Sequence, residues 1–385
     1  MPVPPAGQKL RHFLGSSLVA LFALAPLGVP LSTLDAAAAR SGSPEFTAGL
    51  PADQGPIPLS VGNPLAGRPW GVYKGPLEHS WHAYRQARGQ QRDLLARIAL
   101  RPKATWFGQW LRTEKVRDNV SDYVLNAQHG DPEALVQMAI FAIQPWEREA
   151  CVRLPSAAEK AAFMRWVDEV ALGIGDAHVA LILQPDAPFA LCAPHGSQAP
   201  LDLMRYATER FSQQPNTSVY IEVGAADWLR DDPVKALKIL VPAGIASARG
   251  FALNSTHYDS TERQVHFAAA IALALASRGI TGKYAVINTA QNGRPFKGYE
   301  YQGRNFDNAR ACASRVDSRC VTLGIPPTTA VADPAWGLSP TATAEASAYV
   351  DGYLWFGRPW LYNQASGWDQ QRALTLARTT PYPGP

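Results

Sequence analysis

The sequence predicts an α/β fold built on a parallel sheet of about seven strands, arranged as a β/α barrel or as a doubly wound sheet. Short apolar segments rich in aliphatic residues alternate with longer helix-like segments from about Asn63 onward. Strands that alternate with helices of this length form parallel βαβ units. The composition agrees, since 46% hydrophobic and 18% charged residues over 385 positions suffice for a large buried core.

The expected strands are short apolar runs that end at turn residues. In chain order they cover residues 105–107, 136–143, 179–184, 218–223, 250–253, 284–288 and 352–356. The expected helices between them cover residues 116–127, 157–172, 201–211, 232–240 and 261–276. No internal repeat of about 20 to 50 residues is visible, which argues against a solenoid.

The third expected strand leads to the most informative residue of the chain, Asp186. The run VALIL at 179–183 has the length and the aliphatic content of a strand buried on both faces. Pro185 cannot donate to a sheet ladder, so the strand should stop near Gln184 and leave Asp186 at the carboxyl edge of the sheet. Barrel enzymes hold their catalytic side chains at this edge, and an ordinary turn aspartate is the alternative interpretation.

The regular alternation stops between Ala290 and Ser347, in a segment with Asn292, a Pro-Pro pair and two cysteines. A long irregular segment inside a compact domain usually lines a functional site or closes over it, so we expect this role here. A surface insertion without function is the alternative.

The first 39 residues predict a secretory signal peptide. Lys9 and Arg11 precede an apolar stretch at 13–29, and the small residues at 36–39 offer a cleavage site near Ala39. The apolar stretch is short for a membrane span and is broken by prolines, so a retained anchor is the weaker alternative. We expect a secreted protein with no membrane attachment after cleavage, an extended lead-in at 40–62 and one domain at 63–385.

The charge of the mature chain is close to balanced. Removing Lys9, Arg11 and Asp35 with the signal peptide reduces 36 basic and 32 acidic residues to 34 and 31. This balance argues against nucleic acid or an anionic membrane as the partner. An uncharged substrate fits better.

The chain has four cysteines, Cys151, Cys192, Cys312 and Cys320, all after the expected cleavage site. An even number in an exported protein indicates two disulfides, and the count alone allows three pairings. A metal site would need paired C-x2-C spacing and convergent histidines, which the sequence lacks, so we expect no metal and no cofactor. The His79 and His82 pair suits the surface of a helix.

Nine short segments, in order and at similar intervals, resemble glycoside hydrolase family 6. They are NPLAGRPWGVY (63–73), KATWFG (103–108), LILQPDA (181–187), VYIEVGAADWL (219–229), GFALN (250–254), YAVINTAQNG (284–293), LGIPPTT (323–329), VDGYLWFGRP (350–359) and ALTLAR (373–378). The resemblance implies a distorted parallel β/α barrel with fewer than eight strands. It also implies a secreted cellobiohydrolase or endoglucanase that cleaves β-1,4-glucans with inversion.

The resemblance assigns two catalytic acids. Asp186, in QPDA at 184–187, matches the family motif E-P-D-[SA], whose aspartate is the general acid that protonates the leaving oxygen. A carboxyl with this task needs a raised pKa, from burial or from a nearby negative charge. The family places such a neighbour in a P-x-R-D-C motif, and Glu149 is the best match for it here.

The same motif implies a disulfide pairing. Its cysteine pairs in the family with one downstream of the general acid, which corresponds to Cys151 with Cys192. Such a bridge would tie the two acid-bearing loops together. The remaining cysteines, Cys312 and Cys320, would then close a short local loop.

Sugar-binding residues also follow from the resemblance. Trp70 and Trp228 match tryptophans that stack on sugar rings on either side of the cleavage point. Asn254, Asn292 and Asn363 are expected to supply polar groups to the sugar hydroxyls. Stacking and a place in the core are equal alternatives for Trp106, Trp166 and Trp355.

The sequence departs from the family where the general base is expected. Family members carry a K-R-P-G-E-S-D-G loop after the last strand, and this chain has GRPWLYNQ at 357–364. Counted forward from Pro359, the base position falls on Asn363, whose amide is no useful proton acceptor. Counted back from ALTLAR, the loop is instead several residues shorter, and Asp369 is a weak substitute for the base. Further family positions that carry a histidine, an aspartate, an arginine and a tryptophan are occupied by Ala225, Asn288, Gln291 and a small residue near Ala311.

The predicted function is a secreted glucanase that hydrolyses β-1,4-glucosidic bonds by an inverting mechanism with Asp186 as acid. A carbohydrate-binding relative with impaired catalysis and a glycosidase for a different glycan are the two alternatives. The expected partner is a polysaccharide, and we expect the protein to act as a monomer. The short last loop favours an open groove and cleavage within the glycan chain.

Overall fold

The computed structural model describes residues 62–365 and 367–382. The expected signal peptide and nearly all of the expected lead-in lie outside the described residues. Within the described part of the chain, no helix is long and apolar enough to cross a membrane.

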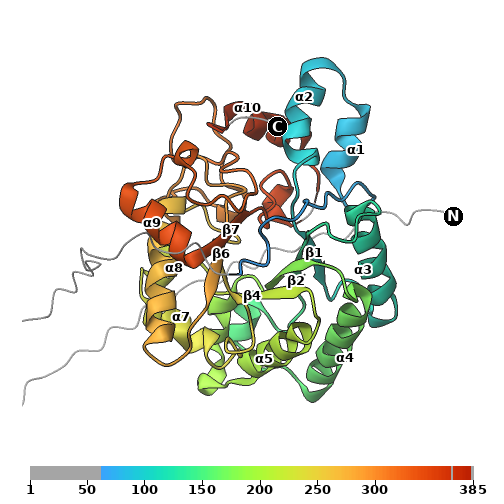
Figure 1. The fold of residues 1–385 in the computed structure, drawn as a ribbon, viewed down its shortest axis with the longest axis vertical. Coiled ribbons are helices and arrows are strands. Elements are labelled where there is room, and N and C mark those ends of the chain that lie inside the picture. Colours follow the sequence, from blue (N-terminus) through green and yellow to red (C-terminus); the bar gives the residue numbers. More distant parts are fainter. Residues whose placement is uncertain (1–61, 366, 383–385) are drawn as a thin grey trace, which may run out of the picture. The chain divides into compact units, whose positions relative to one another are not determined.

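The core of the fold is one parallel sheet whose seven strands follow each other in chain order (Figure 1). The strands are β1 (Thr105–Gly108), β2 (Val136–Phe141), β3 (Val179–Leu183), β4 (Thr217–Glu222), β5 (Gly250–Leu253), β6 (Tyr284–Asn288) and β7 (Val350–Leu354). A doubly wound sheet would reverse its strand order at one point, and this sheet does not. The fold is therefore the β/α barrel type, and all seven expected strands are confirmed to within a few residues.

The barrel is not closed by a strand ladder. The sheet runs from β1 to β7 in sequence order, and β1 and β7 are its edge strands. Two hydrogen bonds join the flanking residues across this gap, from the Ala104 amide to the Trp355 carbonyl (2.8 Å) and from Trp106 Nε1 to the Phe356 carbonyl (2.7 Å). This gap between β1 and β7 explains the distorted barrel that the family resemblance implied.

The barrel interior is filled mainly by small and aliphatic side chains. Alternate residues of the strands point inward, including Ala139, Ile182, Ala252 and Val286, all buried. Small residues suit a narrow interior, because seven strands that curl around it leave little room for large side chains. The opposite face of each strand packs against the surrounding helices.

Five helices follow the strands around the outside, as expected (Figure 1). They are α3 (Thr113–Gln128), α4 (Ala157–Ile174), α5 (Ala199–Ser212), α7 (Pro233–Leu240) and α8 (Thr261–Ala276). Helix α4 shows how local sequence sets the ends. Ser156 and Glu159 form a reciprocal capping box at its start, and Gly175 adopts a left-handed φ of 57° just after its end.

Further helices were not among those expected. They are α1 (His79–Gln86), α2 (Gly89–Ala99), the short α6 (Ala226–Leu229) and α9 (Pro340–Tyr349), together with α10 (Gln370–Thr379), whose ALTLAR stretch was recognised only by resemblance. Helix α9, with the sequence PTATAEASAY, has no clear apolar period, so the pattern could not reveal it. His79 and His82 lie on the exposed side of α1, as expected.

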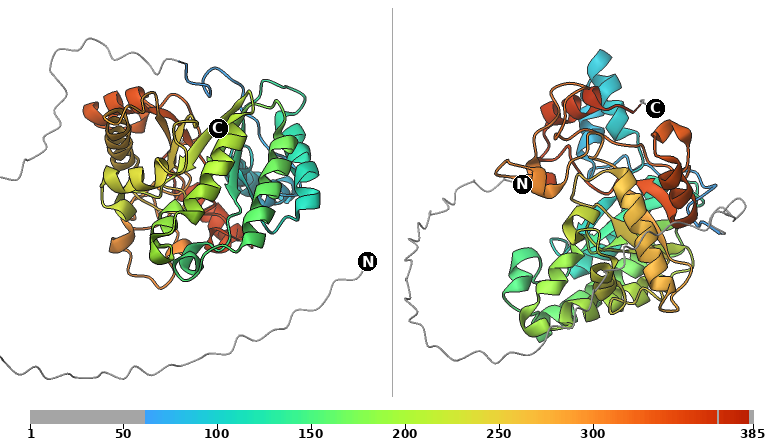
Figure 2. Two further views of the ribbon diagram at one scale, coloured as in Figure 1. Left: turned by 90° about the horizontal axis from the view of Figure 1, so that it is seen from below. Right: turned by 90° about the vertical axis from the view of Figure 1, so that its left-hand side faces the viewer.

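A second hydrophobic cluster lies beside the barrel. Helices α2 and α10 pack together, and Figure 1 shows them with α1 at the top of the view, whereas Figure 2 shows the same part of the molecule from two further sides. Their buried side chains, such as Leu95, Ile98 and Leu376, join residues of the irregular segment after β6. This cluster holds that segment, which contains no strand and whose longest helix is α9, against the barrel.

Candidate active site

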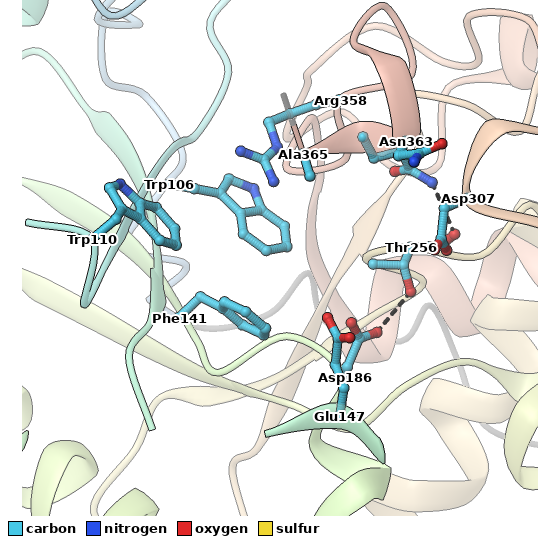
Figure 3. A pocket seen from close by; sticks show the side chains of 11 residues that line it. Trp106, Trp110, Phe141, Glu147, Asp186, Thr256, Asp307, Arg358, Asn363 and Ala365 are labelled. Carbon is cyan, nitrogen blue, oxygen red and sulfur yellow. Dashed lines mark hydrogen bonds between the residues drawn. The ribbon is translucent and has the colours of Figure 1, made fainter. Parts of the chain in front are cut away.

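A cavity of about 350 Å³ lies at the carboxyl ends of the strands. Loops that follow different strands meet here because parallel strands bring their carboxyl ends to one edge. Figure 3 shows aromatic side chains on one side of this cavity and carboxylates and amides on the other. The lining residues are Trp106, Trp110, Phe141, Glu147, Asp186, Thr256, Asp307, Arg358, Asn363, Gln364 and Ala365.

Two left-handed residues shape the loop that carries Asp186. Strand β3 ends at Leu183, and both Gln184 (φ 52°) and Asp186 (φ 65°) adopt the left-handed conformation. Residues other than glycine hold this conformation only where the surroundings enforce it. Here the Gln184 side-chain oxygen accepts hydrogen bonds from the Ala142 and Ile143 amides (3.2 and 3.3 Å). The loop after β3 is thereby fixed to the loop after β2.

The surroundings of Asp186 favour its protonated form. Burial raises the pKa of Asp186 to about 6, against the opposing effects of a hydrogen bond and of the His257 charge. The hydrogen bond comes from the Thr256 hydroxyl, which donates to Asp186 Oδ1 at 2.7 Å. The negative charges of Glu147 and Asp307 raise the pKa further. Asp186 can therefore deliver a proton in mildly acidic solution.

Glu222 lies behind Asp186 in the protein interior. Its side chain is only 1% exposed, and its Oε2 accepts a hydrogen bond from the Ala187 amide at 3.2 Å. Burial, followed by the charge of Asp186, raises the pKa of Glu222 to about 8. Glu222 is consequently neutral at pH 7 and places no second negative charge beside the ionised Asp186.

Glu147, rather than Glu149, is the glutamate that faces Asp186. Glu147 adopts a left-handed φ of 52° and lines the cavity. Figure 3 shows its carboxylate and that of Asp186 pointing to the same end of the cavity. Glu149 is not brought into the cavity, because it pairs with Arg153 at 2.7 Å on the surface and its side chain is 55% exposed.

Two disulfides hold the loops near the site. Cys151 pairs with Cys192, with Cα atoms 4.8 Å apart, as the resemblance implied. This bridge joins the short helices η1 (Glu147–Cys151) and η2 (Ala187–Cys192), which begin at Glu147 and directly after Asp186. Cys312 pairs with Cys320 and closes a loop in the irregular segment. The sequence expectation of two disulfides is confirmed.

A histidine pairs with an aspartate next to the acid. His257 Nδ1 lies 3.0 Å from Asp227 Oδ1, and the imidazole ring stacks on Trp228 with centroids 5.0 Å apart. Burial lowers the pKa of His257, but the hydrogen bond to Asp227 and the charge of Asp227 contribute most to raising it above its ordinary value overall. His257 is therefore a cation under the mildly acidic conditions in which Asp186 is protonated.

The aromatic side of the cavity continues into a groove. A second cavity of about 250 Å³ shares Trp106, Trp110 and Arg358 with the first. The Arg358 guanidinium lies 4.0 Å from the centre of the Trp106 ring, and burial lowers the pKa of Arg358 to about 9. Trp110 is 57% exposed, so its ring is available at the mouth of the groove.

Comparison with known proteins identifies the family. The sequence model described as glycosyl hydrolases family 6 matches residues 72–359, which is most of the chain. The chain belongs to glycosyl hydrolase family 6. The fold class and the resemblance expected from the sequence are thus confirmed.

Curated relatives and solved structures agree with this family assignment. Endoglucanase A of Cellulomonas fimi is 31% identical over 229 residues, which are 59% of this chain and 48% of that protein. Endoglucanase 1 of Streptomyces halstedii is 27% identical over 224 residues, or 57% of this chain and 67% of that protein. This chain therefore spans about half the length of the Cellulomonas protein.

The structural match extends over nearly the whole of a solved relative. The endoglucanase Cel6 of Mycobacterium tuberculosis, solved with a thio-linked cellobioside compound, has a TM-score of 0.65 and 28% identity, covering 82% of this chain and 99% of that one. The catalytic core of the cellobiohydrolase Cel6A of Chaetomium thermophilum has a TM-score of 0.61 at 17% identity, covering 83% and 99%, and supports the fold alone.

Neutral amides lie near the last loop, at positions where the family resemblance implied an aspartate and an arginine. Asn288 Oδ1 accepts hydrogen bonds from the Phe356 and Gly357 amides at 3.1 and 3.0 Å. The Gln291 amide nitrogen donates to the Ser255 carbonyl (3.3 Å). A Cβ on Gly357 would lie 1.8 Å from Gln291 Oε1, so the glycine and the amides fit only together.

The three asparagines expected to bind sugar are not brought together at the cavity. Asn363 lines it, with its Oδ1 accepting from Asn305 Nδ2 at 2.6 Å. Asn254 is fully buried and donates to the Asp259 and Asn288 carbonyls. Asn292 is 5% exposed and donates to the Asp259 carbonyl and the Thr261 hydroxyl, so both of these asparagines support loops.

The two tryptophans expected to stack on sugar have other neighbours. Trp70 forms an isolated bridge with Leu135, the residue before β2, and so lies at the amino end of the sheet, away from the cavity. Trp228 has one face covered by the His257 ring. The cavity is instead lined by Trp106 and Trp110.

Several site residues were not found from the sequence, namely Glu147, Thr256, His257, Asp307 and Arg358. Glu147 lies two residues before Glu149, the acid expected from the sequence, and Thr256 lies three residues after the end of β5. A search of the loops that follow the strands could therefore have included both. Asp307 lies in the irregular segment that was expected to line a site. In the described part of the chain, no group of acidic, histidine or cysteine residues is arranged to hold a metal ion.

Proposed function

We propose that this protein is a secreted β-glucan hydrolase that cleaves β-1,4-glucosidic bonds with inversion, and that Asp186 is its general acid. The observation that carries the proposal is the half-buried Asp186 at the end of β3, with a pKa of about 6. Family membership and the matches to two endoglucanases support the substrate class.

The surrounding groups keep Asp186 in the form that the reaction needs. The acid must be protonated when the glycosidic bond breaks, because its proton goes to the leaving oxygen. Glu147 raises the pKa of Asp186 through its negative charge, and the Thr256 hydroxyl orients the carboxyl. The Cys151–Cys192 bridge holds the loops of Glu147 and Asp186 at a fixed separation.

The aromatic groove supports a polysaccharide as substrate. The apolar face of a glucose ring stacks on indole, while fixed polar groups bind its hydroxyls. Trp110 offers an exposed ring at the mouth, and the two cavities that share Trp106 and Trp110 form one path. This path favours binding within a glucan chain, and hence internal cleavage.

The absence of a carboxylate from residues 357–364 favours a second candidate function, carbohydrate binding without turnover. The two functions differ in product formation. A binding protein would retain glucan without generating new reducing ends.

The test is hydrolysis by the secreted chain with a matched pair of variants. Soluble cellulose derivatives and mixed-linkage β-glucan are incubated with wild type, Asp186→Asn and Asp333→Asn, and new reducing ends are measured. We expect Asp186→Asn to lose about 10²- to 10⁴-fold in rate, the usual contribution of general acid catalysis. Asp333 is exposed and caps the short helix η6 (Pro334–Trp336), a role that asparagine also fills, so its variant should match wild type.

The outcomes separate the candidates. Equal rates in wild type and Asp186→Asn would remove Asp186 from the role of acid. Glucan binding by wild type without any product would replace the hydrolase by the binding protein.

A further inference from the structure

Asp307 is a third carboxylate that points into the cavity, and the proton donation described above does not use it. It lies in the short helix η5 (Phe306–Asn308) of the irregular segment after β6. Figure 3 shows it beside Thr256 on the polar side of the cavity, whereas Asp186 and Glu147 lie together on the other side of Thr256. Two carboxyl groups therefore approach the same space from different loops.

The segment that carries Asp307 packs against the last loop of the barrel. Helix η5 contacts the short helix η7 (Tyr362–Gln364), and Asn305 Nδ2 donates to Asn363 Oδ1 at 2.6 Å. Counted from Pro359, Asn363 is the residue at which the family resemblance would place the base. Asp307 therefore lies on a segment that contacts this loop, and both side chains line the same cavity.

The backbone around Asp307 is fixed on both sides. The Tyr258 hydroxyl donates to the Phe306 carbonyl at 2.8 Å, and Arg372 Nη2 donates to the Ala309 carbonyl at 2.8 Å. Phe306 also packs edge-on against the His257 and Tyr258 rings. These contacts hold the backbone of Asp307 in place relative to the cavity, as the positioning of a catalytic group requires.

We propose that Asp307 is the general base of the reaction and activates the water that attacks the sugar. This inference rests on the proposed function, because it assigns the second carboxylate of the same inverting hydrolysis.

The step balances with these two groups. Water attacks the anomeric carbon from the face opposite the leaving oxygen, and one of its protons passes to the Asp307 carboxylate. The bond from the anomeric carbon to the leaving oxygen breaks, and that oxygen takes the proton of Asp186. Asp307 then releases its proton to solvent, and Asp186 takes up a proton from solvent.

The other candidates for the base are less suitable. Glu147 lies on the side of the acid. His257 is bonded to Asp227, and its raised pKa keeps it protonated when Asp186 is protonated. Asp369 is used as the cap of α10, where it accepts from the Arg372 amide at 2.9 Å.

The electrostatic surroundings of Asp307 are compatible with proton acceptance. Burial raises its pKa above the ordinary value for aspartate, and the positive charge of His257 opposes this rise. The carboxylate is still open to solvent on one side. It can therefore contact a water molecule and later release the proton.

The experiment separates acid from base by leaving-group chemistry and by an added nucleophile. Wild type, Asp186→Asn, Asp307→Asn and the control Asp333→Asn are assayed on mixed-linkage β-glucan and on dinitrophenyl β-cellobioside. Dinitrophenolate leaves without protonation, so the acid variant should keep most of its rate on that substrate. Each reaction is run with and without sodium azide, an anion that attacks without losing a proton.

We expect Asp307→Asn to lose about 10²- to 10⁴-fold on both substrates. Azide should restore the release of dinitrophenolate by this variant and yield α-cellobiosyl azide as the product. Asp333 lies in the same irregular segment, so Asp333→Asn tests whether an Asp-to-Asn change there is harmful in itself. A merely structural role for Asp307 would not produce an azide product.

Each remaining outcome overturns the assignment. Full activity of Asp307→Asn, with Asp186→Asn impaired on glucan, would exclude Asp307 while leaving the proposed function in place. Loss of activity without azide rescue would make Asp307 a structural residue. No turnover of either substrate by wild type would remove the proposed function, and the base with it.

Discussion

At the level of single residues, carboxyl groups with different surroundings divide the acid and base roles. Asp186 is protonated below a pKa of about 6, and Glu222 is neutral up to about 8. Asp307 faces the same cavity from another loop. The role of each carboxyl follows from its burial and its charged neighbours rather than from its chemical type.

Glu147 should contribute, in addition to burial, to the upper pH limit of activity. The groups that act on the pKa of Asp186 are Thr256 and His257, which lower it, and Glu147 and Asp307, which raise it, together with burial. Glu147→Gln removes one negative charge, so the pKa of Asp186 falls. We expect the alkaline limb of the kcat/KM profile to move to lower pH by up to about one unit, measured on β-glucan between pH 4 and 8.

The matched control for this shift is Glu149→Gln, two residues along the chain. Glu149 pairs with Arg153 on the surface and does not line the cavity. Its variant should keep the wild-type profile. A shift with Glu149→Gln and none with Glu147→Gln would show that Glu149 is the helper after all.

The sequence could identify Asp186 but not its partners, for a physical reason. Asp186 follows a buried apolar strand directly, so its place at the sheet edge depends only on the strand. Glu147 and Asp307 reach the cavity through the paths of irregular loops, which are set by a disulfide, capping residues and tertiary packing. Local patterns do not encode those paths.

At the level of elements, the last loop and the loop after β6 pack closely against each other. Gly357 has room for no side chain, because Gln291 Oε1 and Asn288 Nδ2 would lie 1.8 and 2.7 Å from a Cβ at that position. The strands themselves were predictable, since each is a buried apolar run. The amide network between them was not, because it joins residues that are far apart in the sequence.

Gly357→Ala should destabilise the protein through this contact. The added methyl group meets buried amides that are held by other hydrogen bonds, and overpacking of this kind costs about 1 to 3 kcal/mol. Urea unfolding of Gly357→Ala, Gln291→Ala and the double variant measures the coupling. We expect the double variant to be more stable than the sum of the single effects, whereas simple additivity would show that the two sites do not clash.

For the whole molecule, the barrel holds an ion pair at one end and, among the described residues, carboxyl groups without a salt-bridge partner at the other. Asp351 at the start of β7 binds Arg249 at 2.8 Å and accepts a hydrogen bond from the Tyr220 hydroxyl at 2.8 Å. At the opposite end, Glu222 and Asp186 have raised pKa values. The paired charge is compatible with a stable fold, and the unpaired carboxyls cost stability once they ionise.

Glu222 should make the free energy of unfolding fall as pH rises. The folded state holds the Glu222 proton up to a pKa of about 8, while the unfolded chain releases it near its ordinary pKa of 4.5. Between these values the folded state binds more protons, so the stability decreases by roughly 1.4 kcal/mol per pH unit for this group. Asp186 adds to the same trend over its narrower range, from 3.8 to about 6.

Glu222→Gln removes this proton linkage while keeping a polar group of the same shape. Urea unfolding at pH 4, 6 and 8 should show little difference between variant and wild type at pH 4, and a variant that becomes progressively more stable than wild type toward pH 8. Glu209→Gln, on the exposed face of α5, is the matched control. Parallel pH profiles for Glu222→Gln and wild type would mean that the folded protein does not hold the Glu222 proton, and that the buried carboxyl behind Asp186 is ionised.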